Sequence, residues 1–232
     1  MYGEADFDQG SFATLSVRKE QWVFVVPEGI KSEYAAPLMC GGATVFTPLI
    51  EHAKPVDRVG IVGIGGLGHL AIQFAAKMGC TVVVFSGTDS KRDEAMKLGA
   101  HEFYATKGVE DYSTLGLKKP LNHLLLTTSV APDRLDVYYS ILDQRAKIFP
   151  LTVADGTIAT AYSPTLLRGI NIIGSILASR HVHTKMLDFA ARNKVFPIVE
   201  VFPMTEEGVN TAIKKLQDGK VRYRAVLVNG EA

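Results

Sequence analysis

Residues 59–68 read VGIVGIGGLG, and this segment constrains the fold more than any other part of the chain. It joins a Val/Ile-rich run to a Gly-x-Gly-x-x-Gly turn, and an amphipathic stretch then continues to residue 78. In a dinucleotide-binding unit the first glycine allows a tight turn, the second lets the backbone approach a pyrophosphate, and the third lets the helix pack closely on the sheet. These roles fall to Gly63, Gly65 and Gly68. A glycine-rich turn that binds no ligand is the alternative interpretation.

The residues after the second predicted strand, 81–85, indicate which dinucleotide would bind. A site for NAD usually has Asp or Glu at this strand end, where it accepts a hydrogen bond from the ribose 2′-hydroxyl. This chain has Ser86 there, and Lys91 and Arg92 follow. A hydroxyl and two cations suit a 2′-phosphate, so the sequence favours NADP(H). Asp89 could contact a ribose or repel the phosphate, and the two cations could also form an ordinary solvated first turn of a helix.

Alternating strands and helices in most of the chain predict an α/β fold with a doubly wound parallel sheet of the Rossmann type. Six strands are expected, with the first near the centre of the sheet: residues 59–64, 81–85, 102–105, 123–128, 147–152 and 170–176. Helices are expected at residues 66–78, 90–98, 132–142, 182–193 and 206–218. Pro150 is unusual in this pattern, because a proline inside a central strand removes a ladder donor.

The two ends of the chain predict a second, smaller unit. Short strand-like runs occupy residues 12–17 and 22–26, and helices are expected at residues 32–36 and 44–52. A last strand is expected at residues 222–228. The N-terminal segment and this last strand would belong to an incomplete unit beside the main sheet.

Composition narrows the functional classes. The 232 residues are 47% apolar and 21% charged, with a net charge of +1 and no basic run, which argues against nucleic acid as the main partner. No apolar run is long enough to cross a bilayer, and no charged-then-apolar leader opens the chain. Two cysteines do not form a disulfide framework, so we expect a cytoplasmic protein without a membrane partner.

Four segments resemble the zinc-dependent medium-chain alcohol dehydrogenases, in particular the cinnamyl alcohol dehydrogenase type, which prefers NADP and reduces aldehydes. They are AAPLMCGGATVFTPL at 35–49, VGIVGIGGLGHLAIQFAAKMGC at 59–80, SKRDEAMKLGA at 90–100 and DGKVRYRAVLV at 218–228. The resemblance covers nearly the whole chain from about residue 10. It implies that residues 1–45 are a remnant of the catalytic domain, that 46–202 form the Rossmann domain, and that 203–232 return to the remnant.

The resemblance also implies that part of the family's zinc machinery is missing. The zinc-carrying N-terminal part of the family, with its cysteine and histidine ligands, has no counterpart in this sequence. Only Cys40 matches a zinc-ligand position. A catalytic zinc needs three protein ligands, so we expect no metal site. Cys40 would then be either a buried leftover or a free thiol near the nicotinamide.

The resemblance implies cofactor contacts for fifteen residues. Thr44 would lie beside the nicotinamide and phosphates, Ser86 and Lys91 would bind the 2′-phosphate, and Arg224 would approach the pyrophosphate. The glycine turn would contribute Gly63, Gly65, Gly66, Leu67 and Gly68. The backbone near the ribose, nicotinamide and carboxamide would be supplied by Thr127, Thr128, Ser129, Gly174, Ser175 and Ile176. Two departures weaken the match, namely Gly87 in place of a basic residue and the sequence FPL at 149–151.

Three functions remain open. A zinc-free, NADP(H)-dependent reductase of a small carbonyl compound is favoured, and it needs a group that stabilises the developing alkoxide. Cys40, Ser129 and Tyr162 are catalytic candidates, with Tyr104 as another possible hydroxyl. The alternatives are a repurposed enzyme that cyclises or isomerises an apolar small molecule, and a cofactor-binding module without catalysis. The resemblance also implies a homodimer through the edge strand at residues 170–176.

Overall fold

The computed structural model describes residue 10 and residues 12–230. Its main feature is a six-stranded parallel sheet with the order β3-β2-β1-β4-β5-β6. The sheet confirms the predicted doubly wound α/β fold, with β1 near the centre. The strands are β1 (Arg58–Val62), β2 (Thr81–Ser86), β3 (Glu102–Ala105), β4 (Leu121–Leu126), β5 (Leu142–Pro150) and β6 (Asn171–Ile172).

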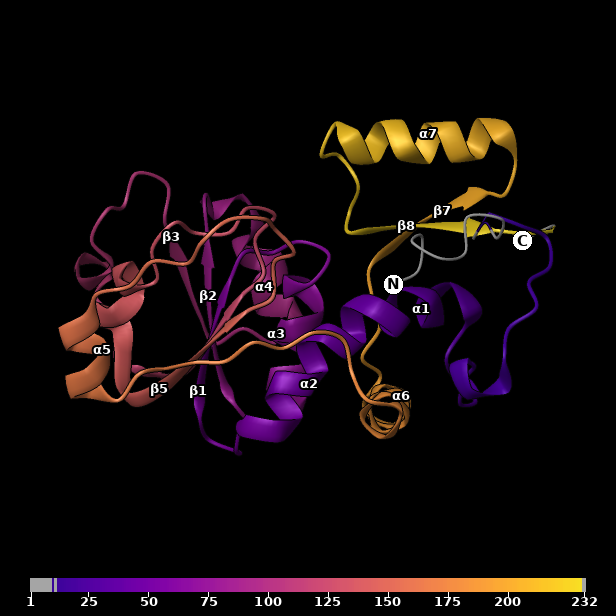
Figure 1. Cartoon of the computed structure of the whole chain (residues 1–232). Helices are drawn as coiled ribbons and strands as arrows, with labels where there is room; N and C mark the ends of the chain where they lie inside the picture. Colours follow the sequence, from indigo (N-terminus) through magenta and orange to yellow (C-terminus); the bar gives the residue numbers. More distant parts are fainter. Residues whose placement is uncertain (1–9, 11, 231–232) are drawn as a thin grey trace.

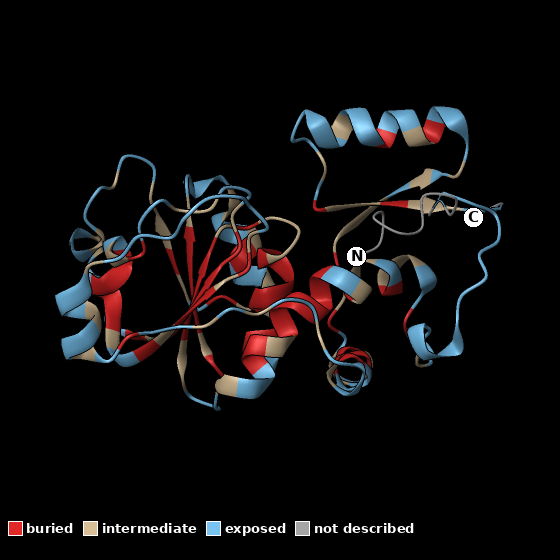
Figure 2. Ribbon diagram, in the orientation of Figure 1, coloured by how far each residue is buried: buried red, intermediate tan, exposed pale blue. Residues whose placement is uncertain are grey.

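Both faces of the sheet are covered, which explains why its central strands are almost continuously apolar. The helices α2 (Ala43–His52), α3 (Gly68–Lys77) and α6 (Arg180–Asn193) contribute to the core on one face. The 3₁₀ turns η4 (Tyr112–Leu115) and η5 (Asp136–Ile141) pack on the other face. The helix α4 (Arg92–Leu98) lies beside α3 and β3. Figure 2 shows the buried residues concentrated in these strands and in α2 and α3.

A smaller sheet forms a second lobe (Figure 1), in which β7 (Val199–Pro203) pairs in parallel with β8 (Arg224–Val228). The connection between them is α7 (Glu206–Gln217), whose N-cap Thr205 accepts a hydrogen bond from the Gly208 amide at 3.1 Å. The helix α1 (Ser32–Pro37) contacts both strands. The predicted division of the chain after residues 45 and 202 stays a prediction, and both limits fall inside elements, α2 and β7.

The two strands predicted near the N-terminus are wrong. Residues 12–17 and 23–26 form no strand, and Glu20–Trp22 form a 3₁₀ turn (η1). A β-branched run becomes a strand only where another strand offers a ladder and one face is buried. Leu15 and Val25 are 88% and 92% exposed, and no described strand pairs with either run.

The region after β4 also departs from the prediction. The expected helix at residues 132–142 is the short 3₁₀ turn η5, and an unpredicted helix, α5 (Tyr162–Arg168), follows β5. Tertiary contacts override the helical pattern, because the Tyr139 hydroxyl bonds to Thr160 at 2.6 Å and to Thr165 at 2.7 Å. These bonds tie η5 to the segment before α5 and to α5 itself.

Strand β6 is shorter than predicted, and this explains how Pro150 is tolerated. Only Asn171 and Ile172 pair with β5, and the last bond runs from the Ile173 amide to the Ile148 carbonyl at 2.9 Å. In a strand, residues two apart direct their backbone polar groups toward the same neighbouring strand. The backbone nitrogen of Pro150 therefore faces the β6 side, as the Ile148 carbonyl does, and it lies beyond this last bond. The expected loss of a ladder donor therefore does not occur.

Among the described residues, no helix combines the length and apolar character needed to cross a membrane.

Candidate functional site

The glycine turn between β1 and α3 has the geometry that its sequence predicts. Gly63 has a φ of +95°, which a side chain would strain. A Cβ on Gly68 would lie 1.9 Å from the Gly63 carbonyl oxygen, so only glycine lets α3 start this close to β1. A Cβ on Gly65 would meet nothing within 4 Å. The open side of Gly65 is therefore free for a ligand.

Two cavities adjoin the turn at the carboxyl ends of the strands, where ligands bind in open α/β sheets. The larger has a volume of about 690 Å³ and the other about 410 Å³. Together they gather most of the predicted cofactor residues. The predicted residues that line at least one of them are Cys40, Thr44, Gly63, Gly65, Gly66, Leu67, Lys91, Thr127, Thr128, Ser129, Ser175, Ile176 and Arg224.

Several predicted residues line neither cavity. Gly68 is buried at the start of α3, Gly174 is exposed after β6, and Ser86 is half-buried at the end of β2. Tyr162 is 82% exposed on α5. Tyr104 lies on β3, where its hydroxyl donates to Glu102 at 2.8 Å, and burial together with that carboxylate raises its pKa to about 12.

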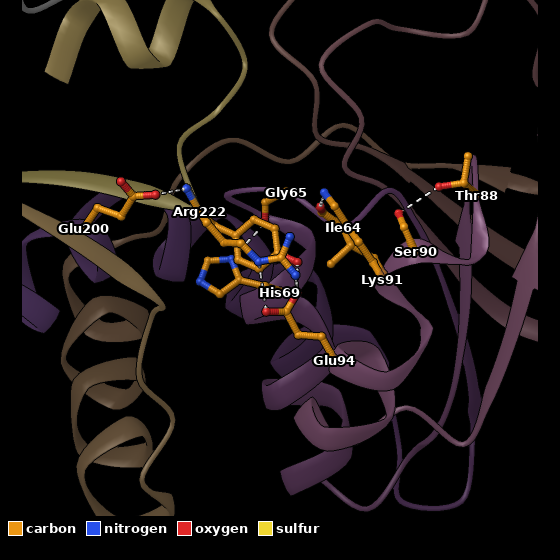
Figure 3. Close-up of polar contacts among 10 residues, drawn as sticks. Ile64, Gly65, His69, Thr88, Ser90, Lys91, Glu94, Glu200 and Arg222 are labelled. Atoms are coloured by element: carbon orange, nitrogen blue, oxygen red, sulfur yellow. Dashed lines mark hydrogen bonds and ion pairs between the residues drawn. The ribbon is translucent and has the colours of Figure 1, made fainter. Parts of the chain in front are cut away.

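The two cations after β2, Lys91 and Arg92, have different hydrogen-bond partners. Lys91 Nζ donates to the Ile64 carbonyl at 2.8 Å (Figure 3). It also lies 5.0 Å from the centre of the Tyr223 ring. Burial, and then the charge of Arg222, lower the pKa of Lys91. Arg92 instead donates to Asp89 and to the Phe103 carbonyl, at 2.6 and 3.1 Å. The predicted pair therefore contributes one cation to the cavity, and Arg92 balances the charge of Asp89.

Arg224, from β8, lines the larger cavity, whereas Lys91 lines the other one. Arg224 Nε donates to the Gly66 carbonyl at 3.1 Å, and burial lowers the pKa of Arg224. A Cβ on Gly66 would lie 2.5 Å from this guanidinium and one on Gly41 would lie 2.8 Å from it, so both glycines make room for Arg224. Among the described residues Arg224 has no carboxylate partner. Its charge is thus available to an anion in the cavity.

Most hydroxyls around the cavity already donate to the backbone. Thr44 bonds to the Cys40 carbonyl at 2.8 Å, Thr127 to the Val62 carbonyl at 2.9 Å and Thr128 to the Val130 carbonyl at 2.7 Å. Within the described part of the chain, Ser175 Oγ is buried without a partner, and Ser129 is exposed with no hydrogen bond from its hydroxyl. Ser129 is therefore the hydroxyl that is both unpaired and accessible to a ligand.

Cys40 is exposed and lines the larger cavity, in the π-helical turn η2 (Leu38–Gly42) before α2. The interpretation of Cys40 as a buried leftover is wrong. The described residues hold no group of three His, Cys, Asp or Glu side chains that could bind a metal ion. Because a catalytic zinc needs three protein ligands, the described side chains do not fit zinc at Cys40.

His69 and Tyr223 are residues of the site that the sequence did not reveal. His69 directly follows the glycine turn and is 0% exposed. Its Nδ1 lies 2.8 Å from the Gly65 carbonyl oxygen, and its ring stacks on Tyr223 at 4.8 Å between centroids. Burial lowers the pKa of His69 to about 4. The signal was its position four residues after Gly65, which places it on the helix face below the turn.

A family model described as zinc-binding dehydrogenase matches residues 66–192. A probable cinnamyl alcohol dehydrogenase of Pinus taeda is 34% identical over 222 residues, which are 94% of this chain. The chain belongs to the zinc-binding dehydrogenase family. It spans 61% of the length of the Pinus taeda relative.

Solved structures of the same family have the same fold. The chain is similar to a cinnamyl alcohol dehydrogenase of Sorghum bicolor, with a TM-score of 0.77 and 32% identity over 87% of this chain and 57% of that one. It is also similar to a cinnamyl alcohol dehydrogenase of Helicobacter pylori in complex with NADP(H). There the TM-score is 0.71 and the identity 25%, over 85% of this chain and 55% of that one.

Proposed function

We propose that this chain binds NADP(H) along the glycine turn and reduces a small carbonyl compound by hydride transfer, without zinc. The observation that carries the proposal is that Lys91 and Arg224 line two cavities that both adjoin the open glycine turn. Amides of a turn before a helix bind phosphates, and the two cations add positive charge. The NADP(H) complex of the Helicobacter pylori relative supports the choice of cofactor.

Each group has a role in this proposal. The turn and Arg224 would hold the pyrophosphate, Lys91 would pair with the 2′-phosphate, and Thr44 would border the nicotinamide. NADPH, when bound, supplies the hydride. The Ser129 hydroxyl would donate a hydrogen bond to the carbonyl oxygen as negative charge develops on it. The alkoxide would take its proton from water, which reaches Ser129 because that residue is exposed.

A second function is favoured by the walls of the larger cavity. Val153, Ile176 and Leu177 line it, and Cys40 offers a free thiol at its edge. Such a cavity suits an apolar small molecule and a non-redox step, a cyclisation or an isomerisation, for which positioning alone lowers the barrier. A non-redox enzyme would convert its substrate without consuming NADPH. A cofactor-binding module would bind NADPH and convert nothing.

The test is NADPH oxidation by the purified protein with a panel of aldehydes and enones. We expect substrate-dependent loss of reduced nicotinamide, and a fall of about 100-fold in kcat for Ser129→Ala with NADPH affinity unchanged. Ser163→Ala is the matched control, because Ser163 is also exposed but lies on α5 away from the cavity. Substrate conversion without NADPH oxidation would favour the non-redox alternative. An unchanged rate for Ser129→Ala would remove Ser129 from the mechanism.

We further propose that the chain forms a homodimer through β6. This strand is the edge of the main sheet, and its outer ladder groups have no partner within the described chain. Ile172, on this strand, is 38% exposed. An exposed apolar edge favours pairing with another strand.

A further inference from the structure

Three consecutive carbonyl groups of the glycine turn each accept a hydrogen bond from a side chain of a different element. Ile64 accepts from Lys91 at 2.8 Å, and Gly66 accepts from Arg224 at 3.1 Å. Between them, the Gly65 carbonyl oxygen lies 2.8 Å from His69 Nδ1. Figure 3 shows Lys91 and His69 converging on the turn from two sides.

These bonds orient the amides of the turn. In a trans peptide group the carbonyl and the following N–H point in opposite directions. Holding the Gly65 carbonyl toward His69 therefore directs the Gly66 N–H away from His69, toward the open side of the turn. The same relation holds for the Ile64 carbonyl with the Gly65 amide, and for the Gly66 carbonyl with the Leu67 amide. These are amides that a diphosphate would use under the proposed function.

His69 differs from the two cations because it cannot leave the turn for the ligand. Lys91 and Arg224 line the cavities and can exchange a carbonyl oxygen for a phosphate oxygen. His69 is fully buried beneath the turn. The ring is also held from the second lobe, since the Ile198 amide donates to its Nε2 at 3.2 Å and Tyr223 stacks on it.

The partners of His69 define its protonation. The Gly65 carbonyl can only accept, so Nδ1 carries the proton, and the Ile198 amide can only donate, so Nε2 carries the lone pair. The imidazole is thus neutral and in the Nδ1–H form. The charged groups that act on it are Arg224 and Glu94, with opposite effects on its pKa.

We propose that His69 is a positioning residue for the diphosphate of the cofactor: its neutral ring fixes the peptide between Gly65 and Gly66 so that the Gly66 amide faces the ligand. This role rests on the proposed NADP(H) binding. It also joins the cofactor site to the start of β7, because the same ring binds Ile198.

Two substitutions of His69 each keep one of the two hydrogen bonds of its ring and remove the other. His69→Asn places an amide nitrogen near the Nδ1 position and can still donate to Gly65, but it loses Ile198. His69→Gln reaches the Nε2 position with an amide oxygen and can still accept from Ile198, but it loses the side-chain bond to Gly65. The Gly65 carbonyl then keeps only the bond from the backbone amide of residue 69, at 3.2 Å. Affinities for NADPH, ADP and adenosine 2′-monophosphate are measured by calorimetry for the original protein and both variants.

We expect His69→Gln to weaken NADPH and ADP binding about tenfold, the effect of one hydrogen bond, and to leave adenosine 2′-monophosphate unchanged because that ligand has no diphosphate. His69→Asn should stay within about twofold of the original protein for all three ligands. Equal losses in both variants, or a parallel loss of adenosine 2′-monophosphate, would overturn the role of His69. If the original protein bound no NADPH, the proposed function itself would fail, and this role with it.

Nitrogen NMR of the original protein tests the proposal even where a variant does not fold. The spectrum should show a neutral His69 with the proton on Nδ1, and the Gly66 amide should shift when NADPH is added. A proton on Nε2 at neutral pH, or a Gly66 amide that does not respond to saturating NADPH, would contradict the proposal.

Discussion

In the proposed function, Lys91 is the side chain that would decide between the two dinucleotides. Its Nζ has no carboxylate partner among the described residues and bonds only to the Ile64 carbonyl, at 2.8 Å. A charge-assisted bond to a 2′-phosphate contributes about 1.5–3 kcal/mol. We expect Lys91→Met to weaken NADPH binding at least about tenfold more than NADH binding, because only NADPH has the 2′-phosphate. Calorimetry with Lys97→Met, an exposed lysine of α4, is the control, and an equal loss for both dinucleotides would contradict this role.

His69 should make stability depend on pH. Burial lowers its pKa to about 4 in the folded protein, whereas the unfolded chain has a value of about 6.5. Between these values the unfolded state binds the proton, so stability that is present above about pH 6.5 is lost as the pH falls toward about 4. The loss due to His69 is about 3 kcal/mol in the free energy of unfolding. Denaturant titrations should give a flatter pH profile for His69→Asn. Identical profiles would mean that His69 is not buried as described.

Substitutions at two positions of the glycine turn should separate an effect on folding from an effect on ligand binding. Gly68→Ala places a Cβ 1.9 Å from the Gly63 carbonyl oxygen, so we expect the free energy of unfolding to fall by about 2 kcal/mol or more. Gly65→Ala meets nothing within 4 Å, so the fold should stay within about 0.5 kcal/mol while the new methyl group obstructs the pyrophosphate. Thermal unfolding and NADPH titration of both variants test this pair. A stable Gly68→Ala, or a Gly65→Ala that binds NADPH normally, would contradict the assigned roles.

Elements defined by local pattern were predictable, and elements defined by distant partners were not. The strand at Arg58–Val62, the turn and helix α3 follow from adjacent residues, and all three are observed. The N-terminal runs had strand propensity but no neighbouring strand, and η5 is held by the hydroxyl of Tyr139. A local sequence pattern shows neither whether a neighbouring strand is present nor which tertiary hydrogen bonds form, because both depend on residues far away in the chain.

The same distinction applies to the site. The glycines and Lys91 could be assigned from the residues themselves, whereas Arg224 required the family resemblance, because it lies 158 positions from Gly66 along the chain. His69 was missed because its position four residues after Gly65 does not by itself show that the ring is buried. Its role depends on Ile198 and Tyr223, which the fold brings to it from the second lobe.

At the scale of the whole molecule, the edge of the main sheet predicts the oligomeric state. A lysine at Ile172 would place a charge on the apolar edge at β6, and edge charges prevent strand pairing. We expect Ile172→Lys to shift the protein from dimer to monomer in light scattering after size exclusion. Ile213→Lys on α7 is the control, since Ile213 is 41% exposed and Ile172 is 38% exposed. A monomer before any substitution would contradict the proposed dimer.

The two lobes meet at the cofactor site, so binding should report on the whole arrangement. The main sheet supplies the glycine turn and Lys91, and the second lobe supplies Tyr223 and Arg224. The most direct test is a calorimetric titration of NADPH into the purified protein, with NADH as the control. The account predicts saturable binding of NADPH and binding of NADH that is at least about tenfold weaker, the share contributed by Lys91 and the 2′-phosphate. No binding of either dinucleotide would show that the turn is only a scaffold and would contradict the account.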